Sequence, residues 1–310
     1  MSAQNRPPQP ALGVLLVVGS CLSLPFGAAV ATMIFPELGS WGVTGLRVLI
    51  AAVVVLIIAR PRLGRWNRAQ WTAAILFGIS IAAMNGMFYA AIDRIPLGPA
   101  VAIEFLGPLV LSAVLTRRVA DAVWVGVALI GMGLLGVDGM VGAEGLDPLG
   151  VLFALIAAGF WIMYIRMSAR VGAVTTGTEG LAVSLAVGAI LLLPFGVPAA
   201  VTAVGDPKVL LLAAVTALLA SVIPYTLELA ALRRLPQRVF GILLSLEPVF
   251  ATLAGFLVLG QHASGLRLAA IALVVVASVG VTAGARKRRG AGPEEEPPSF
   301  MTGSIPVVPD

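Results

Sequence analysis

Long apolar runs recur along this chain, and they leave few folds open to it. Each run has about 20 residues, the length that an α-helix needs to cross the hydrocarbon core of a bilayer. The runs consist of Ala, Leu, Val, Ile and Gly without strict alternation, so helices are favoured over barrel strands. We therefore expect an all-α membrane protein with ten transmembrane helices. The predicted spans are 11–31, 41–59, 71–91, 97–116, 122–138, 149–167, 178–198, 209–231, 239–260 and 267–285.

The composition supports a lipid environment. The 310 residues are 59% hydrophobic and 11% charged, whereas soluble domains carry roughly 25% charged residues. So few charges cannot cover a water-facing surface, and the lipid bilayer is an expected partner. The single cysteine, Cys21, excludes an internal disulfide, and its apolar flanks predict a packing role. His262 is the only histidine, so no Cys/His metal cluster and no cofactor are expected.

The positive charges predict how the chain is oriented. The net charge is +5, but the basic residues form short clusters between apolar runs, a pattern of membrane orientation rather than of nucleic-acid binding. With a cytoplasmic N-terminus, sixteen of the twenty basic residues fall in inner segments, three fall in outer loops, and Arg47 lies within a span. Lys and Arg are enriched on the cytoplasmic side. We therefore expect both termini in the cytoplasm.

The ends of the chain allow one alternative. Arg6 precedes the first apolar run and Ala29-Val30-Ala31 resembles a cleavage site, so this run could be a cleaved signal peptide. A retained helix fits better, because its removal would leave nine spans and break the repeat described next. Residues 1–10 then form a short cytoplasmic N-terminus. The Pro-, Gly- and acid-rich residues 286–310 are expected to be a disordered cytoplasmic tail.

The chain contains an internal repeat. A shift of 140 residues aligns 89–108 with 229–248, and six of twenty positions are identical, including both prolines. The predicted repeats, 11–138 and 149–285, hold five spans each, an odd number, so the second must enter the membrane from the opposite side. Inverted repeats with interrupted helices are a transporter architecture, with the substrate site near the bilayer midplane. A duplicated bundle without transport activity is the alternative.

Four charged residues within the spans favour a transporter: Arg47, Glu104, Glu228 and Glu247. A charge at the bilayer centre costs about 2.5–3.5 kcal/mol on insertion scales, so such residues face a wet cavity or a partner. Arg47 and Glu104 each lie roughly 10 Å from the outer edge by helical rise, which makes them candidates to pair. A purely structural ion pair is the other interpretation of these two residues.

Glu247 stands directly before Pro248 and approaches the midplane. Proline removes a backbone donor and frees a carbonyl in the preceding turn, which is tolerated in a membrane only where the chain lines a cavity or is buried in protein. We therefore expect a substrate or proton role for Glu247, with an inward-facing structural acid as the alternative. Glu228 either shares that role or extends toward Arg233 at the membrane edge.

Polar and aromatic side chains add to the candidate site. Asn85 and Tyr89 are four residues apart, so they share one helix face and are candidates to line a cavity. Tyr225 supplies a further polar aromatic edge within a span.

Several long stretches of the chain resemble one family. These are GVTGLR (42–47), AMNGMFY (83–89), RIPLGPAVAIEFLGP (94–108) and IPYTLELAALRRLPQRVFGILLSLEP (223–248). Over nearly all of residues 11–285 the chain resembles the drug/metabolite transporter superfamily (EamA-type), and within it the threonine/homoserine exporter family. The resemblance implies ten helices in two inverted five-helix repeats, and export of small amino acids across the prokaryotic inner membrane. At Gln261-His262 such proteins often carry Gly-Glu, which puts any role for an acid there in doubt.

The resemblance also implies which residues act. Glu104, Glu247, Glu228, Asn85 and Arg47 are positions that the chain retains. For an amino-acid zwitterion, a glutamate would take the ammonium group, while Arg47 or a helix N-terminus would take the carboxylate. A buried glutamate that also exchanges protons would make export proton-coupled.

Three other functions compete with amino-acid export. The first is transport of a different small solute, such as a drug, a purine or another metabolite. The second is an intramembrane enzyme, which the absence of a nucleophile–base pair, of HExxH and of GxSxG argues against. The third is a scaffold or receptor without transport activity, which the charges within the spans argue against.

Overall fold

The fold is that of a computed structural model, which describes residues 10–116, 119–141, 146–175, 178–232, 234 and 243–284. Within these residues all regular structure is helical. In chain order the elements are α1 (Pro10–Thr32), α2 (Phe35–Leu38), α3 (Ser40–Ala59), η1 (Leu63–Arg65), α4 (Arg68–Ile92), α5 (Leu97–Glu104), α6 (Leu106–Thr116), α7 (Val119–Val141), α8 (Pro148–Val174), α9 (Glu179–Gly205), α10 (Pro207–Ala217), η2 (Leu218–Val222), α11 (Ile223–Leu232), α13 (Glu247–Leu259) and α14 (Gly265–Gly284).

Several helices are able to cross a membrane. In the described part of the chain six are long and apolar enough by length and composition: 11–32, 40–59, 68–92, 148–174, 179–205 and 207–228. Four shorter apolar segments lie at 97–111, 123–135, 247–259 and 265–277. The chain is therefore an all-helical, multi-pass membrane protein, and each of the ten predicted spans contains helix.

Local sequence signals explain where the long helices begin. Asn67 caps α4 through a capping box with Gln70, in which each side chain accepts a hydrogen bond from the other residue's backbone N–H. Asp147 accepts a hydrogen bond from the backbone N–H of Leu149 and so caps α8. Asp206 caps α10 in the same way. These caps satisfy backbone donors that would otherwise lack partners at a helix start.

Two spans predicted as single helices are interrupted. The span 97–116 divides at Phe105 into α5 and α6, because Pro108 lacks the N–H that the carbonyl of Glu104 would accept in a continuous helix. The span 209–231 contains the π-helix η2 between α10 and α11, one turn before Pro224. The described part of 239–260 begins at residue 243, and α13 begins at Glu247.

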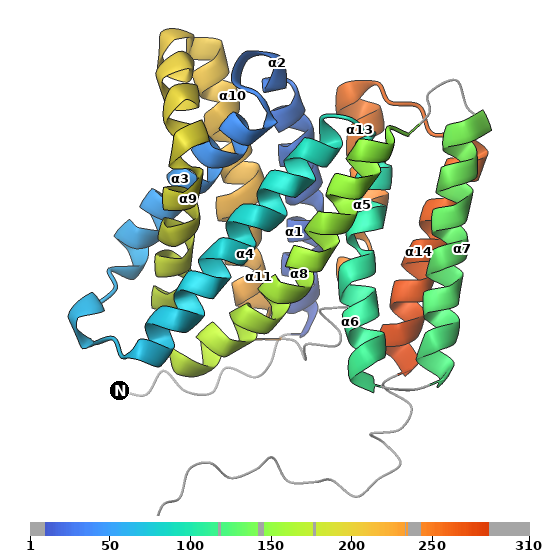
Figure 1. The fold of residues 1–310 in the computed structure, drawn as a ribbon, viewed down its shortest axis with the longest axis horizontal. Coiled ribbons are helices and arrows are strands. Elements are labelled where there is room, and N and C mark those ends of the chain that lie inside the picture. The colour runs from blue at the N-terminus through green and yellow to red at the C-terminus, as the bar shows by residue number, and fades with distance from the viewer. Residues whose placement is uncertain are drawn as a thin grey trace, which may run out of the picture.

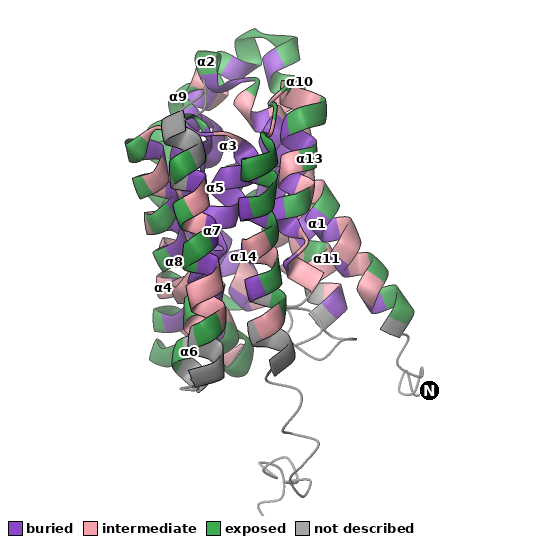
Figure 2. Ribbon diagram, turned by 90° about the vertical axis from the view of Figure 1, so that its right-hand side faces the viewer, coloured by how far each residue is buried: buried purple, intermediate pink, exposed green. Residues whose placement is uncertain are grey.

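The helices form one bundle in which segments far apart in sequence lie side by side (Figure 1). The main pairs are α3 with α9, α4 with α8 and α9, and α7 with α14. Near the centre, α1 packs on α11 and α13, and α5 packs on α13 and α8. Figure 2 shows the buried residues gathered on the inward sides of the helices. The outward sides carry large apolar side chains such as Ile58 and Val201, which suits a lipid surrounding.

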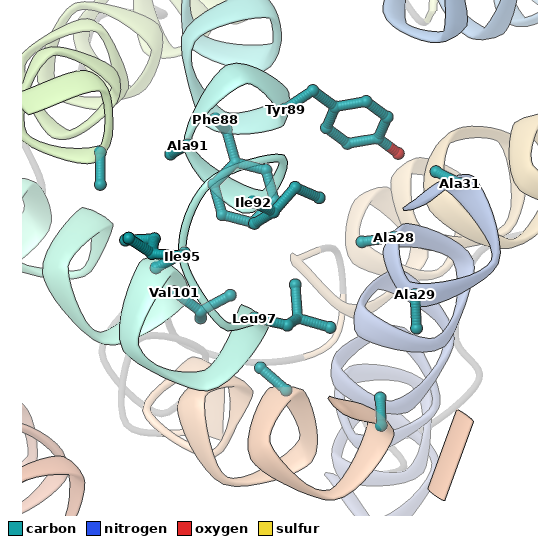
Figure 3. Close-up of a cluster of buried hydrophobic side chains, with 14 of the residues drawn as sticks. Ala28, Ala29, Ala31, Phe88, Tyr89, Ala91, Ile92, Ile95, Leu97 and Val101 are labelled. Carbon is teal, nitrogen blue, oxygen red and sulfur yellow. The ribbon is translucent and has the colours of Figure 1, made fainter. Parts of the chain in front are cut away.

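Small residues bring the central helices close together. In Figure 3, Ala28 of α1 faces the buried side chains of α4 and α5, and Ala29 and Ala31 of the same helix belong to the same buried cluster. At another crossing, a Cβ added to Gly45 of α3 would lie 2.8 Å from the Cα of Gly196 in α9, so the two backbones are in contact. Small residues at such crossings are typical of helix packing in membranes.

Several predicted features lie outside the described residues. These are the N-terminus through residue 9, the tail from residue 285 onward, and the loop that holds Arg233 and Pro236. The first turn of α1 and the last turn of α14 lie at the same end of the bundle (Figures 1 and 2).

Candidate functional site

Arg47 lies in the interior of the bundle and is held by contacts from two other segments. The residue is 3% exposed. One terminal nitrogen of its guanidinium donates a hydrogen bond to the backbone carbonyl of Ala220 in η2, and the other donates to Oδ1 of Asn85 in α4. The guanidinium carbon also lies 4.7 Å from the centroid of the Tyr89 ring, a cation–π distance. The predicted face of Asn85 and Tyr89 is therefore the face that receives Arg47.

Pro224 explains why the carbonyl of Ala220 is available. In a regular helix this carbonyl would accept the N–H of residue 224, and proline has no N–H. The neighbouring carbonyl of Leu219 accepts a hydrogen bond of 2.7 Å from the hydroxyl of Ser23 in α1. Side chains of α3 and α1 thus replace helical hydrogen bonds in η2. π-helical turns of this kind occur frequently at functional sites.

Three buried polar groups in or near this arrangement have no hydrogen-bond partner among the described residues. Nε of Arg47 and the hydroxyl of Tyr89 are buried and make no hydrogen bond within the described part of the chain. The hydroxyl of Thr216, one turn before Ala220, is in the same condition. A buried donor without an acceptor costs about 1–3 kcal/mol, and more if it is charged.

Glu104 and Glu247 are also buried, but they are held differently. Glu104 is the last residue of α5 and Glu247 is the first residue of α13, two helices that pack on each other. Their exposed fractions are 8% and 5%. Both carboxylates therefore lie inside the protein rather than against lipid. Among the described residues neither accepts a hydrogen bond or forms an ion pair.

The expected ion pair between Arg47 and Glu104 does not form. The two residues have similar depth along their helices, but the guanidinium is directed to Asn85 and Ala220 instead. Arg47 is nevertheless the basic group whose charge acts on Glu104. Depth along a helix does not determine the direction of a side chain, which is why the sequence argument gave the wrong partner.

Glu228 on α11 is half-buried, and its Oε1 accepts a hydrogen bond of 2.8 Å from the hydroxyl of Ser20 on α1. The alternative contact with Arg233 lies outside the described residues. The charges of Glu228 and Glu104 act on Glu247, and Tyr225 is within hydrogen-bonding reach of Asn85. The structure thus places all seven predicted residues in one interior region: Arg47, Asn85, Tyr89, Glu104, Tyr225, Glu228 and Glu247.

A second set of polar contacts lies at one end of the bundle. Arg94, after α4, forms an ion pair of 3.1 Å with Asp147, before α8. The Leu149 backbone N–H, and then the Arg94 side chain, lower the pKa of Asp147 below its usual value. Oε1 of Gln261, between α13 and α14, accepts a hydrogen bond of 3.1 Å from the N–H of Leu97 at the start of α5. The loop between α4 and α5 is therefore tied to two later segments of the chain.

Sequence reasoning missed the partners of the charged groups. Ala220 could have been found, because Pro224 frees a carbonyl four residues earlier. Ser20 carries no such signal, since a serine within an apolar run is common and only the fold brings it to Glu228.

Comparisons with known proteins indicate the family to which the chain belongs. A model of the EamA-like transporter family matches residues 148–283. The threonine/homoserine exporter RhtA of Salmonella typhimurium is 35% identical over 271 residues, which cover 87% of this chain and 91% of that protein. The threonine/homoserine exporter RhtA of Escherichia coli K12 is 34% identical over 279 residues, 89% of this chain and 93% of that protein.

A solved crystal structure covers 90% of this chain and 99% of its own, with a TM-score of 0.57 at 24% sequence identity, which shows a shared fold. The exporter relatives match this chain over nearly their full length, and their sequence identity is high enough to show a common family as well as a common fold. The chain therefore belongs to the EamA-like transporter family, alongside the threonine/homoserine exporters, and is a transporter rather than an enzyme.

Proposed function

We propose that this protein exports small amino acids of the threonine or homoserine type across the inner membrane, and that export is coupled to protons. The observation that carries the proposal is a buried region in which the charge of a fixed cation, Arg47, acts on Glu104, while neither Glu104 nor Glu247 has a hydrogen-bond or ion-pair partner among the described residues. An amino-acid zwitterion carries the complementary pair of charges. The printed names of the relatives point to the same class of substrate.

The proposed architecture has ten helices in two inverted repeats, which work by alternating access. Support comes from the packing pattern. In two repeats, each of the first five spans corresponds to the span five places further along the chain. Under this correspondence the contact of α4 with α8 matches that of α11 with α1, and the contact of α5 with α8 matches that of α13 with α1. All four contacts are observed. The pairs α3–α9, α5–α13 and α7–α14 map onto themselves. The match of the family model to 148–283 fits a second unit of this length.

The proposed orientation places both termini in the cytoplasm. The first turn of α1 and the last turn of α14 share one end of the bundle, as ten crossings require. The exposed Arg166 and Arg170, near the C-terminal end of α8, also belong to the predicted inner segments.

The proposed mechanism assigns separate roles to the charged groups. Glu247 and Glu104 exchange between binding a proton and binding the substrate ammonium group, since no donor among the described residues occupies them. Glu228 shares this role while Ser20 holds its orientation. Arg47, or an exposed helix N-terminus, provides the positive potential for the substrate carboxylate. Asn85, Tyr89 and Tyr225 line the same region.

Uptake of labelled threonine into inverted membrane vesicles tests this proposal. Uptake by the wild-type protein is expected to rise when a pH gradient is imposed. Glu247→Gln keeps the shape of the side chain but cannot exchange protons, so gradient-driven uptake should fall at least about tenfold. Glu37→Gln, at the exposed helix α2, is the matched control and should transport normally. Normal rate and coupling in Glu247→Gln would refute the role of this residue.

A further inference from the structure

Nε of Arg47 and the hydroxyl of Tyr89, two donors without a partner in the described part of the chain, need the same kind of ligand atom. Nε of Arg47 carries one hydrogen and no lone pair for acceptance, and the Tyr89 hydroxyl carries a hydrogen of its own. Both are buried, with the residues 3% and 1% exposed. A ligand that satisfies both must offer two acceptor atoms, and the positive guanidinium favours a negative charge on them. A carboxylate meets all these conditions with its two oxygens.

The position of each donor is fixed before a ligand arrives. The guanidinium is held by Ala220 and Asn85, and Asn85 is held in turn by a hydrogen bond of 2.7 Å from its Nδ2 to the carbonyl of Ile81. The Tyr89 ring packs against Phe35 and Phe88, at centroid distances of 5.7 and 6.1 Å. Donors held in place in this way lose little entropy when they bind a ligand.

The surroundings of the tyrosine hydroxyl keep it available. In Figure 3 the hydroxyl is directed toward the turn of α1 that carries Ala31, and a second alanine, Ala28, lies one turn earlier on this helix. Neither side chain can accept a hydrogen bond. With Cζ of Arg47 4.7 Å from the ring centroid, the guanidinium and the hydroxyl both lie next to this ring, within reach of one planar ligand group.

We infer that Nε of Arg47 and the hydroxyl of Tyr89 form the subsite for the substrate carboxylate, and that Tyr89 makes the transporter select solutes that carry this group. This inference rests on the proposed function, which leaves open whether Arg47 or a helix N-terminus binds the carboxylate. The subsite places the substrate carboxylate beside α3 and α4, while the ammonium group extends toward Glu104. Since the charge of Arg47 acts on Glu104, the two ends of a small zwitterion have opposite partners in one region.

Transport kinetics in proteoliposomes test the inference. Tyr89→Phe removes only the hydroxyl, and the loss of a hydrogen bond to a charged group should raise the KM for threonine roughly tenfold to a hundredfold, with little change in the maximal rate. Thr202→Val, which also removes one hydroxyl but at an exposed position on α9, is the control and should keep the wild-type KM. A wild-type KM in Tyr89→Phe would overturn the inference.

A second measurement needs no variant. Threoninamide differs from threonine at the carboxylate, so it should compete with labelled threonine at least about tenfold more weakly in the wild-type protein. Equal competition by the two compounds would overturn the subsite even if Tyr89→Phe failed to fold.

Thermal unfolding of the purified protein separates this inference from the proposed substrate. The twenty common amino acids and their amides are each added to the wild-type protein and to Tyr89→Phe. Suppose that threonine is not transported, but that another amino acid raises the Tm of the wild-type protein while its amide does not. If Tyr89→Phe loses this rise in Tm, the carboxylate subsite is correct and the proposed substrate is wrong. If no amino acid raises the Tm of the wild-type protein, the carboxylate subsite is wrong.

Discussion

The buried cation and the buried carboxylates of this transporter are held in opposite ways. Arg47 donates hydrogen bonds to two segments of the chain and stacks on Tyr89, whereas Glu104 and Glu247 have no hydrogen-bond partner within the described residues. All three are less than a tenth exposed. The difference separates a cation that the fold holds in one position from carboxylates that no other side chain holds within the described residues. Arg47 keeps only Nε for a ligand, whereas both carboxylates keep all their acceptor positions within the described residues.

Replacement of Arg47 by Met should give the largest effect on stability. It leaves the Ala220 carbonyl and Oδ1 of Asn85 without a donor, at about 1–3 kcal/mol each, in a region that water does not easily reach. We expect a large drop in Tm in detergent and loss of threonine uptake. Arg47→Lys should recover little of the lost stability, because an ammonium group lacks the planar geometry with which the guanidinium reaches both acceptors. Arg170→Met, at an exposed site on α8, is the control and should unfold at the same temperature as the wild-type protein. If Arg47→Met also had the wild-type Tm, Arg47 would not be a charge that the fold depends on.

Glu104→Gln should affect function far more than stability. No hydrogen bond is lost, and a buried charge becomes a neutral amide, so we expect the Tm to change by no more than about 2–4 °C, the equivalent of about 1 kcal/mol. Gradient-driven uptake should nevertheless fall strongly. Tm and gradient-driven uptake, measured for both Arg47→Met and Glu104→Gln, test the contrast between the buried cation and the buried carboxylates. This contrast is contradicted if Glu104→Gln unfolds at as low a temperature as Arg47→Met.

The smallest effect is expected at the surface ion pair. The pKa of Asp147 is lowered, so its carboxylate favours the folded state at neutral pH, and this contribution disappears as the pH falls through the lowered pKa, below the usual range of an aspartate. Asp147→Asn should therefore unfold slightly earlier than the wild-type protein at pH 7, and the two should converge in acid. Exposed pairs contribute little, so a difference as large as that of Arg47→Met would show that this end of the bundle is more than a surface contact.

The sequence predicts the helices well because lipid imposes a simple rule on them. Every apolar run contains helix in the described residues, since backbone groups in a membrane must satisfy one another. The breaks at Phe105 and in η2 follow from Pro108 and Pro224, whose missing N–H groups can be read from the sequence. The burial of Glu104 and Glu247 was predicted on the same physical ground, the cost of a charge in lipid.

The contacts inside the bundle could not be predicted in this way. Arg47 was expected to pair with Glu104 from their similar depth, but the choice of partner depends on helix rotation, which no local pattern of the sequence determines. The bond from Ser20 to Glu228 joins residues 208 positions apart and exists only because α1 packs on α11. Local signals therefore locate charged residues, while their partners follow from the packing.

The crossing of α3 and α9 has a consequence for substitutions. At Gly45 and Gly196 the two backbones meet without side chains between them, and a Cβ on Gly45 would come within 2.8 Å of Gly196. Any side chain added at Gly45 would therefore meet the backbone of α9, which cannot move aside as a flexible side chain can. A larger residue at Gly45 would thus force α3 and α9 apart and displace Arg47, which lies only two residues further along α3.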